Sequence, residues 1–193
     1  MILPNRIFFT GVPGSRWSGI AQTLESMPYF NTTDRTRERE YLHGGFTGHK
    51  GAYFGRKMEF EAKLDADYLD SAWEPNSQGS KLVKSHDWSY SLHQIKKKFP
   101  NDWIMLVYRD NTASFKWWKE AGGWDIKYPS YTAYQNDVIM TREIDWQNFA
   151  IKQFAQEHNL QWNTFTSDWI NEHFSKDVIV ERNWPDIFVT ILK

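Results

Sequence analysis

Three short segments of the sequence carry side chains suited to binding a phosphate or sulfate group. The first is the glycine-rich run at 10–19, TGVPGSRWSG. In such a loop small residues let the backbone approach an anion, and the N–H groups at the start of a following helix can enclose it. Ser15 and Ser18 would add hydroxyl donors, and Arg16 would add a charged one. An ordinary glycine turn has a similar composition. The Walker pattern is absent, because no Lys-Ser or Lys-Thr pair follows.

The second segment is Lys84-Ser85-His86-Asp87, which follows a short apolar run. A neutral imidazole at the end of a strand can accept a proton from a hydroxyl that attacks a bound donor. We therefore take His86 as a candidate general base. The alternative is a surface histidine that caps the next helix.

The third segment begins at Arg109, directly after the apolar run 103–108. The planar guanidinium can donate two hydrogen bonds to a phosphate monoester, and Ser114 could supply a neutral donor from the next helix. Alternatively, Arg109 pairs with a carboxylate of the protein. Each of the three segments is ambiguous when it is considered alone.

The elements around these segments predict an α/β fold. Apolar runs at 6–10, 81–84 and 103–108 indicate strands, and each precedes a helix-like pattern, at 18–27, 89–98 and 111–121. This alternation is typical of a three-layer domain with a central, mostly parallel sheet. The carboxyl ends of parallel strands meet at one edge of a sheet, so the three segments should lie together there.

The rest of the chain predicts less regular structure. We expect an irregular insertion around 31–80, with a possible helix at 58–69, and one or two helices within 131–159. Further expected elements are a strand at 161–166, a short helix at 168–174 and strands at 178–180 and 187–192. Gly122 and Gly123 should end the helix that precedes them. We expect one domain, 1–193, for a chain of this length.

Composition narrows the classes of function. The net charge of -1 gives no overall attraction to nucleic acid, and the absence of cysteine excludes disulfides, thiolate metal sites and a cysteine nucleophile. The apolar runs are strand-sized, so we expect no membrane span. The chain starts without a signal-peptide pattern, and we expect a cytoplasmic protein. The sequence predicts no oligomeric state.

The order and spacing of the three segments resemble those of the cytosolic-type sulfotransferases. That family has a phosphosulfate-binding loop after the first strand, a Lys-Thr-His segment after a later strand, and an Arg and a Ser that hold the 3′-phosphate of the donor. The stretch from 81–86 through 98–100 to 105–109 is similar nearly throughout, and His86 precedes Arg109 by 23 positions. The segment 166–174 is similar to a later strand and short helix of the family. In the loop, Arg16 is the only cation near Ser15.

The resemblance implies a P-loop-like nucleotide-binding fold and the donor 3′-phosphoadenosine 5′-phosphosulfate. The sulfuryl group would pass by in-line displacement, without a metal, to a hydroxyl or amine of a small-molecule or glycan acceptor. His86 would be the base, Arg16 would stabilise the leaving bisphosphate, and Arg109 with Ser114 would bind its 3′-phosphate. The donor loop would comprise Gly11, Pro13, Gly14, Ser15, Arg16, Trp17 and Ser18. Aromatic residues that could line an acceptor site are Trp117, Trp118, Trp124, Tyr128 and Tyr131.

Three other functions stay open at this point. A small nucleotide-dependent kinase shares the order of strand, phosphate loop and helix, but the loop lacks the Lys and the metal-binding hydroxyl of that class. A catalytically silent module could bind a nucleotide or a protein on the same fold. A metal hydrolase would have to use His43, His49 and His86, and the first two lie in a glycine-rich stretch without a clear acidic partner.

Overall fold

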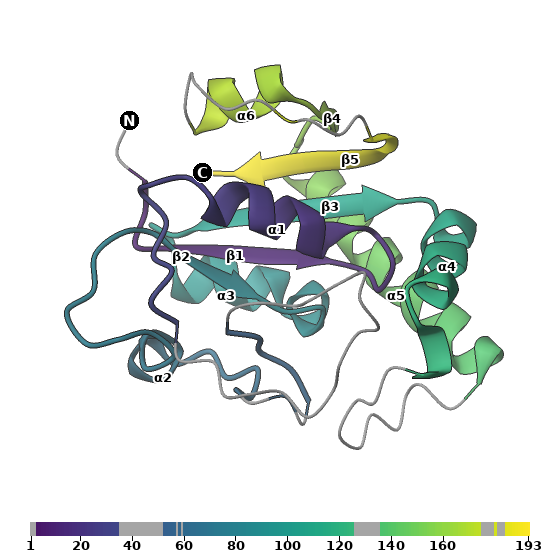
Figure 1. Cartoon of the computed structure of the whole chain (residues 1–193), viewed down its shortest axis with the longest axis horizontal. Helices are drawn as coiled ribbons and strands as arrows, with labels where there is room; N and C mark the ends of the chain where they lie inside the picture. Colours follow the sequence, from purple (N-terminus) through teal and green to yellow (C-terminus); the bar gives the residue numbers. More distant parts are fainter. Residues whose placement is uncertain are drawn as a thin grey trace.

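A five-stranded sheet forms the centre of the molecule (Figure 1). This computed structural model describes residues 3–34, 52–56, 58, 60–125, 136–174, 180 and 184–193. The strands lie in the order β2-β1-β3-β5-β4. Their bounds are β1 Arg6–Gly11, β2 Lys81–Lys84, β3 Trp103–Arg109, β4 Asn163–Phe165 and β5 Trp184–Leu192.

The sheet is mixed. β1 pairs in parallel with β2 and with β3, whereas β5 runs antiparallel to both β3 and β4. The α/β class is therefore confirmed, and the expectation of a mostly parallel sheet is corrected: two neighbouring pairs are parallel and two are antiparallel. The physical reason is that an apolar run indicates a buried strand but not whether the strand runs parallel or antiparallel to its neighbours. The sequence pattern of the C-terminal strand is compatible with both directions.

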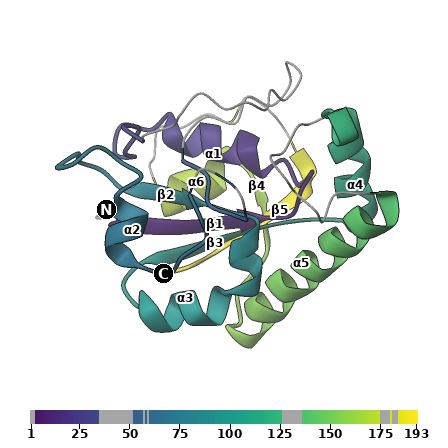
Figure 2. The same cartoon turned by 90° about the horizontal axis from the view of Figure 1, so that it is seen from below.

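Helices cover both faces of the sheet (Figure 2). Along β1, Ile7 and Phe9 face one apolar cluster with α1 and α6, and Phe8 faces the other with α3 and α5. All three side chains are fully buried, as is typical of a central strand in a sheet with two covered faces. The helices are α1 Trp17–Glu25, α2 Ala66–Asp70, α3 Leu92–Lys98, α4 Asn111–Glu120, α5 Asp137–Glu157 and α6 Ser167–His173, with 3-10 turns η1 Asp87–Tyr90 and η2 Gly123–Asp125.

Local capping explains where several helices begin and end. The side chain of Asp110 accepts hydrogen bonds from the backbone N–H groups of Thr112 and Ala113, which starts α4 directly after β3. Gly122 and Gly123 have positive φ of 123° and 47°, so the expected glycine stop is confirmed. Asn136 caps α5, which is a single helix.

Other expectations need correction. The helix expected at 58–69 is the shorter α2, because Asp65 caps it by accepting a hydrogen bond from the N–H of Tyr68. The helix expected at 89–98 is divided into η1 and α3 at Ser91. β5 begins earlier than expected, at Trp184. Of the strand expected at 178–180, only Val180 is described, and it lies outside any strand.

A buried ion pair joins α1 to the edge strand β2. Lys84 is 1% exposed, and its Nζ contacts Oε1 of Glu25 at the end of α1. Burial raises the pKa of Glu25, and the attraction of the Lys84 ammonium offsets only part of that effect. Lys84 therefore holds α1 against the sheet. It stands two positions before His86 in the sequence.

In the part of the chain that the structure describes, no helix has the length and apolar character needed to cross a membrane.

Candidate active site

The three segments come together at the carboxyl ends of β1, β2 and β3, as the sequence predicts. Nδ1 of His86, after β2, contacts the carbonyl oxygen of Gly11 at the end of β1. Nη1 of Arg109, the last residue of β3, donates to the carbonyl oxygen of Gly14 at 3.1 Å. His86 lies 75 positions from Gly11 in the sequence, and Arg109 lies 95 positions from Gly14. The backbone of one loop thus joins the ends of the three strands.

The loop between β1 and α1 is a tight turn with an unusual backbone. The N–H and the hydroxyl of Ser15 both donate to the carbonyl of Val12, at 3.0 Å and 2.7 Å. Gly14 has φ of 79°, and a Cβ at this position would lie 1.9 Å from the carbonyl oxygen of Ser114. Only glycine fits here, because the loop backbone packs directly on α4.

Arg16 immediately precedes α1 in the left-handed conformation, with φ of 62°. A left-handed residue followed by helical ones turns successive N–H groups toward one side, which forms a concavity suited to an anion. The first turn of α1 contains no acidic residue that would occupy this positive end. The Cζ of Arg16 lies 3.4 Å from the centroid of the Trp117 ring, so a cation–π contact joins the loop to α4.

The other predicted loop residues differ in their exposure. Pro13, Ser15 and Trp17 are buried, whereas Ser18 is half-buried. The Ser15 hydroxyl donates within the turn, so it shapes the loop in this conformation and is not directed at a ligand. Ser18 lies in the first turn of α1 and is the more exposed of these two serines.

His86 is half-buried, and its surroundings define its tautomer. A carbonyl oxygen can only accept, so the contact with Gly11 places a proton on Nδ1; in the neutral imidazole the basic lone pair is then on Nε2. The ring lies 4.1 Å from the ring of Trp17, which itself stacks on Phe9 at 5.6 Å. Packing on Trp17 and the hydrogen bond with Gly11 thus hold the orientation of the imidazole.

Arg109 has a protein partner in this structure. Its Nε and Nη2 donate to Oδ2 of Asp186 in β5, at 2.8 Å and 2.6 Å. The sequence allowed this pairing as an alternative to phosphate binding, and the 3′-phosphate role stays a prediction. The hydroxyl of Ser114 is fully buried and lies 3.3 Å from the carbonyl oxygen of Arg109, to which it donates. Ser114 thus supports the end of β3.

A second polar cluster lies beside His86 and was not predicted as a unit. Oδ2 of the buried Asp87 accepts from the backbone N–H of Arg56 at 2.9 Å, and burial raises the pKa of Asp87. Burial and the negative charge of Glu143 raise the pKa of Tyr90. Arg56, Asp87 and Tyr90 line a cavity of about 410 Å³. The signal in the sequence was Asp87 itself, next to His86, but its partners come from a separate part of the chain.

Two sequence expectations depend on residues with no described placement. The aromatic wall is only partly described: Trp118 and Trp124 meet edge to face at 4.7 Å, whereas Tyr128 and Tyr131 lie outside the described residues. His43 and His49 also lie outside them, and within the described ranges no cluster of three His, Asp or Glu side chains could hold a metal ion.

No family model, curated protein or solved structure matches this chain.

We predict that Gly14→Ala is strongly destabilising. The positive φ alone costs about 1–2 kcal/mol for an L-residue, and the overlap with the Ser114 carbonyl adds about 1–3 kcal/mol. Gly123→Ala is the matched control, because Gly123 also has positive φ but its Cβ would stand 3.5 Å from the nearest atom. Urea unfolding of both variants measures the difference. Equal losses of unfolding free energy would mean that Gly14 is constrained by its backbone angle alone.

Proposed function

We propose that this protein is a sulfotransferase with a P-loop-like donor site formed by the loop 11–18 and α1. The main support is the contact between His86 and the Gly11 carbonyl, which sets a candidate base beside a loop suited to an anion. The resemblance in sequence supplies the donor, 3′-phosphoadenosine 5′-phosphosulfate. An acceptor hydroxyl or amine of a small molecule or glycan would receive the sulfuryl group. The absence of cysteine suits a reducing, cytoplasmic setting.

The proposed reaction is an in-line displacement at sulfur. The acceptor oxygen or nitrogen attacks the sulfur and passes its proton to Nε2 of His86, while the bond from sulfur to the bridging oxygen breaks and adenosine 3′,5′-bisphosphate leaves. Negative charge builds on that oxygen, and donors already in place lower the barrier. Arg16 and the N–H groups at the start of α1 would supply them. In this scheme they provide the neutralisation that Mg²⁺ gives in phosphoryl transfer.

The cavity beside Asp87 is the candidate acceptor site. Its polar and charged lining residues are Arg56, Glu61, Lys63, Asp87, Tyr90 and Ser91, and Asp87 directly follows His86. An acceptor there would be recognised by hydrogen bonds more than by an apolar surface. This favours a polar acceptor, such as a sugar or an amine, over a simple phenol.

The ion pair of Arg109 implies competition during donor binding. Two of the guanidinium N–H groups are held by Asp186 and a third by the Gly14 carbonyl. A 3′-phosphate at this place would have to displace the Asp186 carboxylate, which is 49% exposed and can turn toward solvent. Asp186 would therefore weaken donor binding while it keeps Arg109 at the loop.

From this competition we predict that Asp186→Asn strengthens the binding of adenosine 3′,5′-bisphosphate. An exposed ion pair contributes up to about 1 kcal/mol, so the gain should be up to about fivefold. Adenosine 5′-phosphate, which lacks the 3′-phosphate, should bind equally to both proteins. Titration calorimetry makes the comparison.

Asp67→Asn makes the same change of charge at an exposed position of α2, and it should change the binding affinity of neither ligand. The assignment of Arg109 would be refuted by equal gains for both ligands in Asp186→Asn. Tighter binding of Mg-ATP than of the bisphosphate by the unmodified protein would instead favour the kinase.

His86→Ala should lower turnover by about 100- to 10,000-fold, the usual contribution of a general base, with donor affinity nearly unchanged. His93→Ala is the matched control, because that imidazole is 63% exposed on α3. The assay measures bisphosphate release with sugars, amines and phenols, above hydrolysis of the donor alone. Full activity of a folded His86→Ala variant would exclude this base. If the protein bound the donor but released no bisphosphate with any acceptor, the catalytically silent binding module would be favoured.

A further inference from the structure

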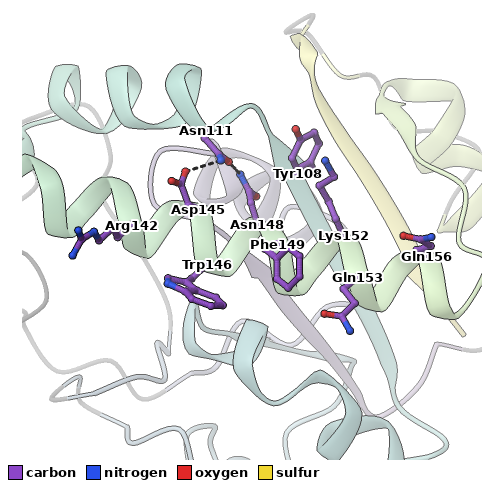
Figure 3. A pocket seen from close by; sticks show the side chains of 10 residues that line it. All are labelled: Tyr108, Asn111, Arg142, Asp145, Trp146, Asn148, Phe149, Lys152, Gln153 and Gln156. Carbon is purple, nitrogen blue, oxygen red and sulfur yellow. Dashed lines mark hydrogen bonds between the residues drawn. The ribbon is translucent and has the colours of Figure 1, made fainter.

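A groove runs along the exposed side of α5, with a volume of about 820 Å³ (Figure 3). The α5 residues that line it recur every three or four positions, from Arg142 through Trp146 and Phe149 to Gln156, so they share one helix face. The opposite wall comes from Tyr108 of β3 and Asn111 of α4. None of the residues assigned above to the donor or the acceptor site lines this groove.

Large aromatic side chains are exposed in the groove. Trp146 and Phe149 are 63% and 60% exposed, and their rings meet edge to face with centroids 6.2 Å apart. The Tyr108 ring also lines the groove, and it packs against Trp162 at 5.8 Å and Phe188 at 6.3 Å. Exposed aromatic faces can cover the apolar C–H face of a ring-shaped ligand while its polar edge stays in water.

Fixed amide and carboxylate groups stand beside the rings. Nδ2 of the buried Asn148 donates to the Arg109 carbonyl at 2.8 Å and to Oδ1 of Asn111 at 2.5 Å, and Nδ2 of Asn111 donates to Oδ1 of Asp145 at 2.6 Å. These hydrogen bonds, of which Figure 3 draws the two that join Asn148, Asn111 and Asp145, fix the orientation of all three side chains. Oδ1 of Asn148 is buried without a partner, although buried polar atoms normally have one. The wall of the groove thus contains polar side chains held in fixed orientations.

Two cations mark the groove at separated positions. Arg142 and Lys152 lie ten residues apart on α5, which is about 15 Å along a helix. Nζ of Lys152 sits 5.2 Å from the centre of the Tyr108 ring. Among the described residues that line the groove, these two cations outnumber one carboxylate, Asp145, so the groove favours a ligand with some negative charge.

We propose that this groove binds an acidic oligosaccharide, one whose sugar rings carry carboxylate groups. The rings would lie on Trp146 and Phe149, the hydroxyls would pair with the amides and Asp145, and carboxylates would approach Lys152 and Arg142. A single-stranded nucleic acid fits less well, because grooves that bind it carry positive charge along the whole backbone and stack its bases on aromatic rings. Here the two lining cations stand about 15 Å apart with Asp145 between them on α5, and the Trp146 and Phe149 rings meet edge to face. The proposal goes beyond the proposed function and depends on none of the side chains assigned to it.

The test is titration calorimetry of the full chain, without donor, against hexasaccharides of galacturonate, hyaluronan and alginate. We expect at least one to bind, and Trp146→Ala/Phe149→Ala to weaken that binding at least tenfold. Both side chains are mostly exposed, so the variant should unfold at the temperature of the unmodified protein. Val138→Ala, which removes another exposed apolar side chain from α5 outside the groove, should bind as the unmodified protein does.

The charge of the ligand is tested separately. Methyl-esterified hexagalacturonate removes the carboxylate charges, and it should bind several-fold more weakly than the acid when the acid is a ligand. Arg142→Gln/Lys152→Gln should abolish the preference of the groove for acidic over neutral hexasaccharides. The proposal is overturned if no hexasaccharide binds at millimolar concentration, if the aromatic variant binds as well as the unmodified protein, or if hexauridylate binds more tightly than every sugar. None of these results affects the bisphosphate titrations, so the two proposals fail independently.

Discussion

The close approach of the loop after β1 to α4 is the constraint on which the candidate active site depends. Gly14 lies against the backbone of Ser114 with no space for a side chain, and its carbonyl oxygen accepts from Arg109. This contact fixes the loop relative to the end of β3, while the Gly11 carbonyl fixes His86 after β2. A loop held in this way needs little reorganisation when an anion arrives, which is the usual requirement of electrostatic stabilisation.

The same residues serve both structure and the proposed chemistry. Arg109 supports the loop through Gly14 and is neutralised by Asp186 in the absence of ligand. Arg16 lies over the Trp117 ring, so its charge is held near α4 and not free to explore the solvent. Nδ1 of His86 contacts the Gly11 carbonyl, and in the proposed reaction Nε2 is the base. A phosphosulfate bound by this site would meet groups whose positions the fold has largely set in advance.

Much of this arrangement could be predicted from the sequence, because local patterns determine it. The three βα units follow from apolar runs, glycine turns and caps such as Asp110, and their strand ends had to share one edge. Pairings between residues far apart in the chain could not be predicted from the sequence. Asp186 lies 77 positions from Arg109, and no local feature marks it as the partner. The direction of β5 and the exposure of Trp146 and Phe149 likewise depend on packing between distant elements, because a periodic pattern does not show which helix face stays uncovered.

In the proposed donor site, the loop after β1 and Arg109 together bind the two phosphates of adenosine 3′,5′-bisphosphate. A crystal structure of the protein with this product is the decisive experiment. We expect the 5′-phosphate against the backbone N–H groups at the start of α1, near Arg16 and Ser18, and the 3′-phosphate on an Arg109 that has released Asp186. A bisphosphate bound elsewhere would refute this donor site, as would one bound at the loop while Arg109 still holds Asp186 and the 3′-phosphate points into solvent.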